Sequence, residues 1–124
     1  GQIEGGFIQG LGWLTTEELV WNEDGRLTTH APSTYKIPAC ADRPVDWRVG
    51  FFAEGENSEE TIHESKAVGE PPLMLAISAW LALSDALSGI NGDKIDGATY
   101  PGLDAPATPE RILLCANRLG ARFV

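Results

Sequence analysis

The position of Glu70 makes it the strongest candidate for chemistry in this sequence. It stands directly before Pro71 and Pro72, and proline fits the first turn of a helix. Glu70 is therefore expected at the N-cap or first position of a helix, whose partial positive charge favours an ionised carboxylate. An ionised carboxylate that follows Gly69, where the backbone can be approached closely, suits a general base. The alternative interpretation is a plain helix cap.

Two glutamines, Gln2 and Gln9, bracket a glycine-rich segment at the start of the chain. Their primary amides offer donors and acceptors to a heteroaromatic ring or a phosphate, or are simply exposed to solvent. Lys66 is a candidate to pair with an anion near Glu70, or a solvated charge.

A metal site made only of protein ligands is not indicated. His30 and His63 are far apart, with no carboxylate or cysteine at ligand spacing. Cys40 and Cys115 lack a Cys-x-x-Cys partner, so they are expected as buried free thiols. Any metal would have to arrive inside a cofactor. The sequence also has no glycine-rich nucleotide loop and no serine nucleophile with a histidine partner pattern.

The composition sets the broad class of the protein. With 124 residues, 43% of them hydrophobic and 22% charged, the chain has the usage of one globular unit. A net charge of -9 argues against a nucleic-acid partner. The longest apolar stretch, residues 71–83, is shorter than the roughly 20 residues that cross a bilayer, so a soluble, cytoplasmic protein without a membrane partner is expected. The chain opens inside a patterned segment without an initiator Met, as expected of a piece of a longer protein.

The first element that must position these residues is a helix over residues 3–14. Its apolar positions recur at helical spacing, at Ile3, Phe7, Leu11 and Leu14. Each glycine among them weakens a helix by up to roughly 1 kcal/mol relative to alanine. So many glycines indicate that another backbone, or a ligand, comes very close.

The middle of the chain is expected to contain extended structure. Residues 17–21 and 26–29 flank a turn at Asp24 and Gly25, which predicts a β-hairpin. Residues 32–38 are bracketed by prolines and predict an ordered extended loop. Residues 47–52 are rich in β formers and predict a strand, and residues 61–63 predict a short extended piece.

The second half predicts two helices. The run 73–87 is apolar nearly all round and stops at Gly89, so it must be buried on most sides, which a chain this small can hardly achieve alone. After a loop, Thr108 and Pro109 predict the start of a final helix that Gly120 ends. The predicted fold class is therefore α+β: a glycine-rich helix, a β-hairpin, further strand structure, a buried helix and a C-terminal helix.

Three segments resemble the xanthine dehydrogenase and aldehyde oxidase family of molybdenum hydroxylases. They are GQIEGGFIQGLG at residues 1–12, PSTYKIP at 32–38 and SKAVGEPPL at 65–73. Their order and separation are similar to those in the C-terminal part of the family's molybdopterin-binding region. The resemblance implies that residues 1–124 are a segment of a larger molybdopterin-binding catalytic domain. Residues 1–90 are family-like, and the loop and terminal helix of 91–124 are unassigned.

The resemblance also implies roles for individual residues. Glu70 is implied to take the proton from a molybdenum-bound hydroxyl that attacks an electron-poor carbon, with hydride passing to the sulfido ligand. Gln2 is implied to contact the molybdopterin cofactor, and the segment Lys66, Ala67, Val68 and Gly69 to pass near it. Iron–sulfur clusters and FAD are implied on other domains or subunits, as partners together with the remainder of the molybdopterin-binding region.

Several functions remain open at this point. The leading expectation is hydroxylation of a purine, xanthine or hypoxanthine, within a larger assembly, with the isolated chain inactive. An aldehyde oxidase-type hydroxylase of the same family and a non-catalytic interaction module are the alternatives. A hydrolase that uses Glu64 and Glu70 as a carboxylate pair is a weaker one.

Overall fold

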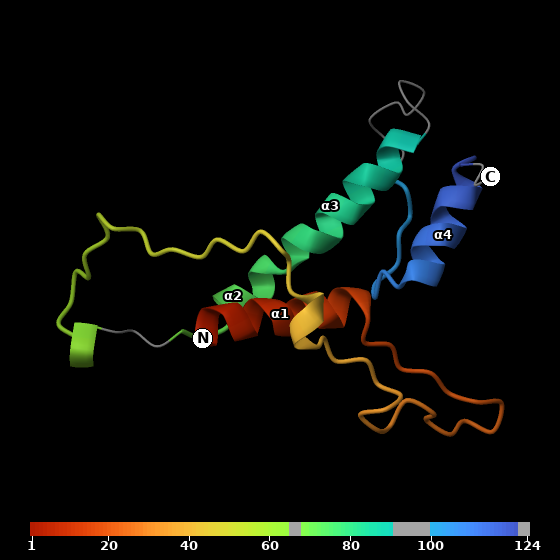
Figure 1. Ribbon diagram of the computed structural model, residues 1–124, viewed down its shortest axis with the longest axis horizontal. Coiled ribbons are helices and arrows are strands. Elements are labelled where there is room, and N and C mark those ends of the chain that lie inside the picture. The colour runs from red at the N-terminus through yellow and green to blue at the C-terminus, as the bar shows by residue number, and fades with distance from the viewer. Residues whose placement is uncertain (65–67, 91–99, 122–124) are drawn as a thin grey trace.

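The computed structural model describes residues 1–64, 68–90 and 100–121. Four α-helices form its body, with two short 3-10 helices in the connections (Figure 1). In chain order the elements are α1 (Gln2–Thr15), η1 (Cys40–Asp42), η2 (Ile62–Glu64), α2 (Pro71–Leu75), α3 (Ile77–Ser88) and α4 (Pro109–Arg118). Two long excursions, before and after η1, leave the helical body in opposite directions (Figure 1).

The glycine-rich helix α1 is confirmed, and two of its glycines explain how it packs. A Cβ added at Gly6 would lie 3.0 Å from the Pro72 Cβ, and one at Gly10 would lie 2.7 Å from the Ala76 Cβ. The missing side chains therefore let the start of α2 approach the α1 backbone closely. At these positions the close neighbour is another part of the chain.

The expected α+β class is not supported, because the described residues contain no β-strand. The turn at Gly25 forms, with φ of 74°. The segments on either side of it make only one isolated β-bridge, between Trp21 and Leu27. The expected strand over residues 47–52 has no regular structure, and Ile62–Glu64 is a 3-10 turn. Residues with β propensity form a strand only when a partner strand or a covering face is present, and the described part of the chain offers no neighbouring strand.

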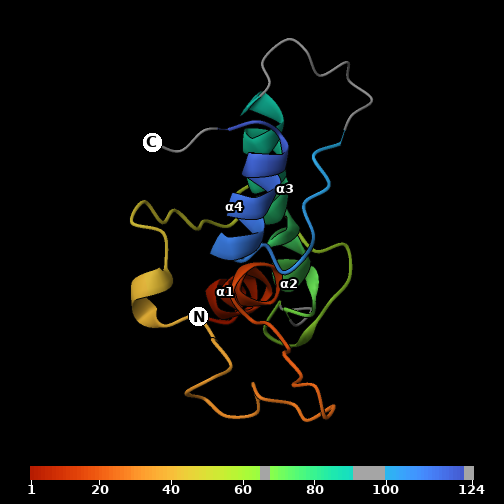
Figure 2. The same ribbon diagram turned by 90° about the vertical axis from the view of Figure 1, so that its right-hand side faces the viewer.

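The expected helix over 73–87 is present but divided at Ala76. Before this break α2 covers α1, and after it α3 runs beside α4, as both views show (Figures 1 and 2). The small core lies between α3, α4 and the segment that precedes α4. Its buried members are Leu87, Leu103, Ala107, Cys115 and Ala116. Cys115 is thus buried as expected, whereas Cys40 is exposed.

Much of the apolar surface of α2 and α3 is uncovered, in agreement with the expectation that this chain cannot bury it. Met74 is 51% exposed, Leu75 62% and Leu81 53%. By length and composition alone the 18-residue run Pro71–Ser88, with a mean hydropathy of 1.3, could cross a membrane, and it is longer than the expected stretch of 71–83. Core helices of soluble proteins meet the same criterion.

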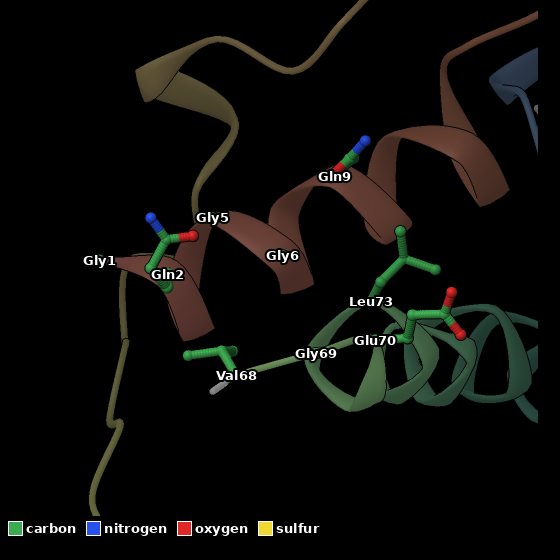
Figure 3. A pocket seen from close by; sticks show the side chains of 9 residues that line it. All are labelled: Gly1, Gln2, Gly5, Gly6, Gln9, Val68, Gly69, Glu70 and Leu73. Atoms are coloured by element: carbon green, nitrogen blue, oxygen red, sulfur yellow. The ribbon is translucent and has the colours of Figure 1, made fainter. Parts of the chain in front are cut away.

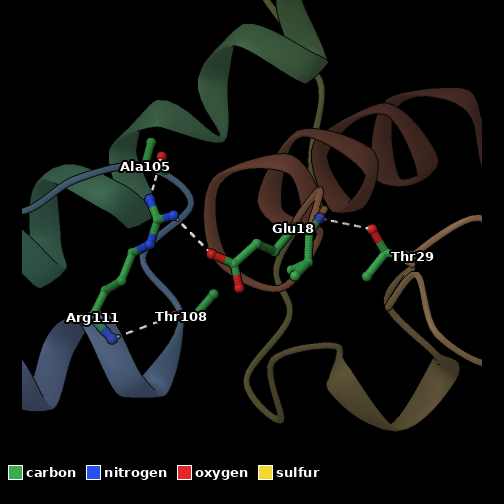
Figure 4. A network of polar contacts seen from close by, with 6 residues as sticks. Glu18, Thr29, Ala105, Thr108 and Arg111 are labelled. Atoms are coloured by element: carbon green, nitrogen blue, oxygen red, sulfur yellow. Dashed lines mark hydrogen bonds and ion pairs between the residues drawn. The ribbon is translucent and has the colours of Figure 1, made fainter. Parts of the chain in front are cut away.

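Helix α4 begins as the sequence predicts and is attached to the segment that follows α1. The Thr108 side chain accepts a hydrogen bond from the Arg111 amide, at 3.3 Å. The Arg111 guanidinium donates to the Glu18 carboxylate at 2.7 Å and to the Ala105 carbonyl at 2.9 Å (Figure 4). Gly120, with φ of 92°, follows the helix.

Candidate functional site

A hollow lies between the first turns of α1 and the start of α2, with a volume of about 530 Å³ (Figure 3). Its walls come from two segments that are far apart in the sequence but share the α1–α2 contact. The lining residues are Gly1, Gln2, Gly5, Gly6, Gln9, Val68, Gly69, Glu70 and Leu73. The hollow is therefore lined by every described residue for which the family resemblance implies a cofactor-binding or catalytic role.

The α1 wall of the hollow is mostly bare backbone. A Cβ added at Gly5 would meet nothing within 4 Å, unlike one at Gly10. Gln2 and Gln9 are on the same wall, two turns apart, and Figure 3 shows that neither amide points toward Glu70. Space next to exposed backbone, with amide groups beside it, suits a flat, hydrogen-bonding ligand.

On the opposite wall, Glu70 occupies the N-cap position of α2, but its side chain does not cap the helix. Its backbone is helical, with φ of -83° and ψ of -20°, and its side chain makes no capping hydrogen bond. Its carbonyl oxygen accepts from the Met74 amide at 3.1 Å. The plain-cap interpretation is therefore not supported, because the exposed carboxylate at the rim of the hollow is not used for capping.

The turn before Glu70 depends on Gly69. This residue has φ of 62°, in the left-handed region that favours glycine. It redirects the chain immediately before α2 and places Val68 and Glu70 along the same hollow. A bulkier residue at Gly69 would strain this turn and displace the carboxylate.

Four of the six predicted site residues, Gln2, Val68, Gly69 and Glu70, are thus brought together. Lys66 and Ala67 lie outside the described residues. The sequence reasoning did not select Gly5 or Leu73, which also line the hollow. The signal for Gly5 was its place in a helix with more glycines than one helix contact requires.

The histidines are not part of this site. The His30 ring lies 3.0 Å from the Leu27 carbonyl oxygen, in the excursion after α1. In the described ranges no three side chains of His, Cys, Asp or Glu come together as metal ligands would.

Comparison with known proteins supports a cofactor role for this region. Residues 1–44 match the family model of the molybdopterin cofactor-binding domain. The chain is 44% identical to a xanthine dehydrogenase of Oryza sativa subsp. japonica, over 99% of the chain. It is 49% identical to a xanthine dehydrogenase/oxidase of Gallus gallus, over 90% of the chain, and 46% identical to a xanthine dehydrogenase of Blastobotrys adeninivorans, over 94%.

These matches cover only 8–9% of the length of the three relatives, so the chain corresponds to a small part of each. Within that part the similarity extends over nearly all of its residues. Over nearly all of its residues this chain is thus similar to a small part of xanthine dehydrogenases, and its first 44 residues match a molybdopterin cofactor-binding domain.

Proposed function

We propose that this chain is part of a molybdenum hydroxylase that oxidises a purine, and that Glu70 is its catalytic base. The observation that carries the proposal is that Glu70, whose side chain is unused for capping, lines the same hollow as Gln2 and the bare Gly5 backbone. One wall of this hollow would hold the cofactor and the other would supply the base.

The residues present fit the molybdopterin cofactor in part. The Gln2 amide can both donate and accept hydrogen bonds to the ring edge of a pterin. Gly5 leaves open the space that a side chain would occupy, and the Gly69 backbone borders it. When bound, the cofactor supplies the oxidation, accepting two electrons from the substrate. The remaining contacts to it would come from elsewhere in a larger protein.

The part of the reaction that belongs to this chain is proton transfer. Glu70 would accept a proton as the carbon of the substrate becomes hydroxylated. A carboxylate is suited to this role when it is not held by a competing partner, and the Glu70 side chain makes no cap bond. Leu73, one turn later on α2, contributes an apolar surface beside the carboxylate.

The purine is favoured over an aldehyde because the relatives are named xanthine dehydrogenases. We further propose that iron–sulfur clusters and FAD on other domains carry the electrons onward. With most of the cofactor pocket supplied by other parts of the enzyme, the isolated chain would be inactive. If the chain is instead a non-catalytic interaction module, it would bind its partner through the exposed α2 and α3 surface and would show no turnover.

The experiment that tests the proposal is purification of the full-length protein, followed by its molybdenum and iron content and its turnover of xanthine, hypoxanthine and an aldehyde. We expect both metals and faster turnover of the purines. Metals with turnover of the aldehyde alone would replace the purine by the aldehyde alternative. A protein that binds neither metal and turns over none of the three would support the interaction module.

A further inference from the structure

Trp47, in the excursion after η1, is attached to the first turns of α1. Its indole Nε1 donates a hydrogen bond to the Glu4 carboxylate, at 3.0 Å. Its ring also meets Phe7 edge-on, with ring centroids 5.5 Å apart and an interplanar angle of 64°. Glu4 and Phe7 are three residues apart and thus share one face of the helix. Trp47 therefore contacts α1 over two successive turns.

This contact lies on the side of α1 away from Gln2. A helix turns by about 100° per residue, so Glu4 is about 200° around the axis from Gln2. Trp47 and Glu4 border a second hollow, while Gly1 and Gly5 border both hollows. The first turn of α1 is thus a thin wall, with Trp47 on one side and the proposed cofactor space on the other.

Two features that commonly stabilise the first turn of a helix are missing from α1. Its N-cap, Gly1, has no side chain with which to cap the free amides. Gly5 and Gly6 are themselves poor helix formers. The Gly5 amide bonds to the Gly1 carbonyl at 2.8 Å. Glu4 attaches this turn to Trp47 through its side chain.

We propose that Trp47 and Glu4 form a positioning pair that orders the first turn of α1 and so presents Gln2 to the pterin. This inference rests on the proposed function. Neither residue needs to touch the cofactor, because the pair acts through the helix turn that carries Gln2. Loss of the pair would therefore shorten the time for which the cofactor is retained.

The test compares five single variants of the full-length holoenzyme. Trp47→Phe keeps the ring contact with Phe7 and removes the donor, whereas Glu4→Ala removes the acceptor. Glu4→Gln keeps an acceptor oxygen. Trp13→Phe is the matched control, because it makes the same change at an exposed tryptophan of α1. Gln2→Ala removes the proposed cofactor contact directly.

Two measurements are made on each variant: hydrogen exchange of the Gly5 amide, whose bond to the Gly1 carbonyl closes the first turn of α1, and the rate at which molybdenum is lost during dialysis. We expect Trp47→Phe and Glu4→Ala to speed first-turn exchange about tenfold, the factor for one hydrogen bond to a charged acceptor. The rate of molybdenum loss should rise by up to the same factor, because retention of the cofactor can fall no further than the ordered fraction of the first turn falls. Trp13→Phe should resemble the parent, and Glu4→Gln, which keeps an acceptor without its charge, should lie between the parent and Glu4→Ala.

The outcomes separate this inference from the proposed function. If Gln2→Ala speeds molybdenum loss but Trp47→Phe changes neither measurement, or only exchange, the positioning pair is refuted and the cofactor contact stands. If Gln2→Ala has no effect on molybdenum loss, the proposed contact is refuted, and this inference with it. The double variant Trp47→Phe with Gln2→Ala should lose molybdenum no faster than Gln2→Ala alone, and additive losses would also refute the pair.

Discussion

Alanine at Gly10 should push α1 and α2 apart, whereas alanine at Gly5 should leave their packing unchanged. At Gly10 the new Cβ would meet the Leu73 carbonyl oxygen and would lie 2.7 Å from the Ala76 Cβ. Carbon atoms prefer about 3.5–4.0 Å, so the helices would have to separate by about 1 Å. Overpacking of this kind costs about 1–3 kcal/mol, offset by up to about 1 kcal/mol of gained helix propensity.

The expected result for Gly10→Ala is a net destabilisation of about 1–2 kcal/mol. Gly5→Ala has no clash and should stabilise the helix by about 0.5–1 kcal/mol. Native-state hydrogen exchange of the α1 amides in the full-length protein measures both, since about 1.4 kcal/mol changes the protection tenfold. Equal protection in the two variants would refute the account of α1–α2 packing.

Gly5→Ala has a second consequence, because its methyl group would enter the proposed cofactor space. Molybdenum content should therefore fall although the helix is at least as stable as in the parent. A variant with full molybdenum content would show that the space beside Gly5 is not used by the cofactor.

Three further results are expected from the structure. Thr108→Ala should destabilise α4 by about 1 kcal/mol through loss of its cap, seen as faster amide exchange confined to α4. Arg111→Ala should cost about 0.2–1 kcal/mol through loss of the partly exposed Glu18 pair, and the cost should shrink at high salt. A hydrogen bond with Glu17, with smaller contributions from desolvation and the Glu17 charge, raises the pKa of Tyr35. The stabilisation by this bond is therefore complete below about pH 10 and is lost above it. Tyr35→Phe should abolish this pH dependence when the free energy of unfolding is measured across this pH range.

The helices could be predicted from the sequence where local rules suffice. The spacing of Phe7 and Leu11 indicates α1, and Thr108 with Pro109 marks the start of α4. The division of the apolar run at Ala76 has no local signal, because every neighbouring residue is compatible with a continuous helix. After this division α3 stays in contact with α1 and also packs against α4.

The strands could not be predicted correctly because β propensity does not supply a partner. Phe51 and Phe52 are typical strand residues, yet they are 85% and 78% exposed in an excursion that pairs with no strand among the described residues. For the site, the motif around Glu70 selected a segment that lines the same hollow as Gln2, and its catalytic role stays a prediction. The contact of Trp47 with Glu4 joins positions far apart in the chain, and neither residue alone indicates it.

The most direct test of Glu70 as the base is the turnover rate of Glu70→Gln in the full-length holoenzyme, expressed per bound molybdenum. Glu110→Gln is the matched control, since Glu110 is also an exposed acid at the proline-led start of a helix. We expect Glu70→Gln to retain its molybdenum and to lose about 10²–10⁴-fold in kcat, the contribution of a positioned general base. The control should equal the parent, and a Glu70→Gln rate within about twofold of the parent would contradict the proposed role.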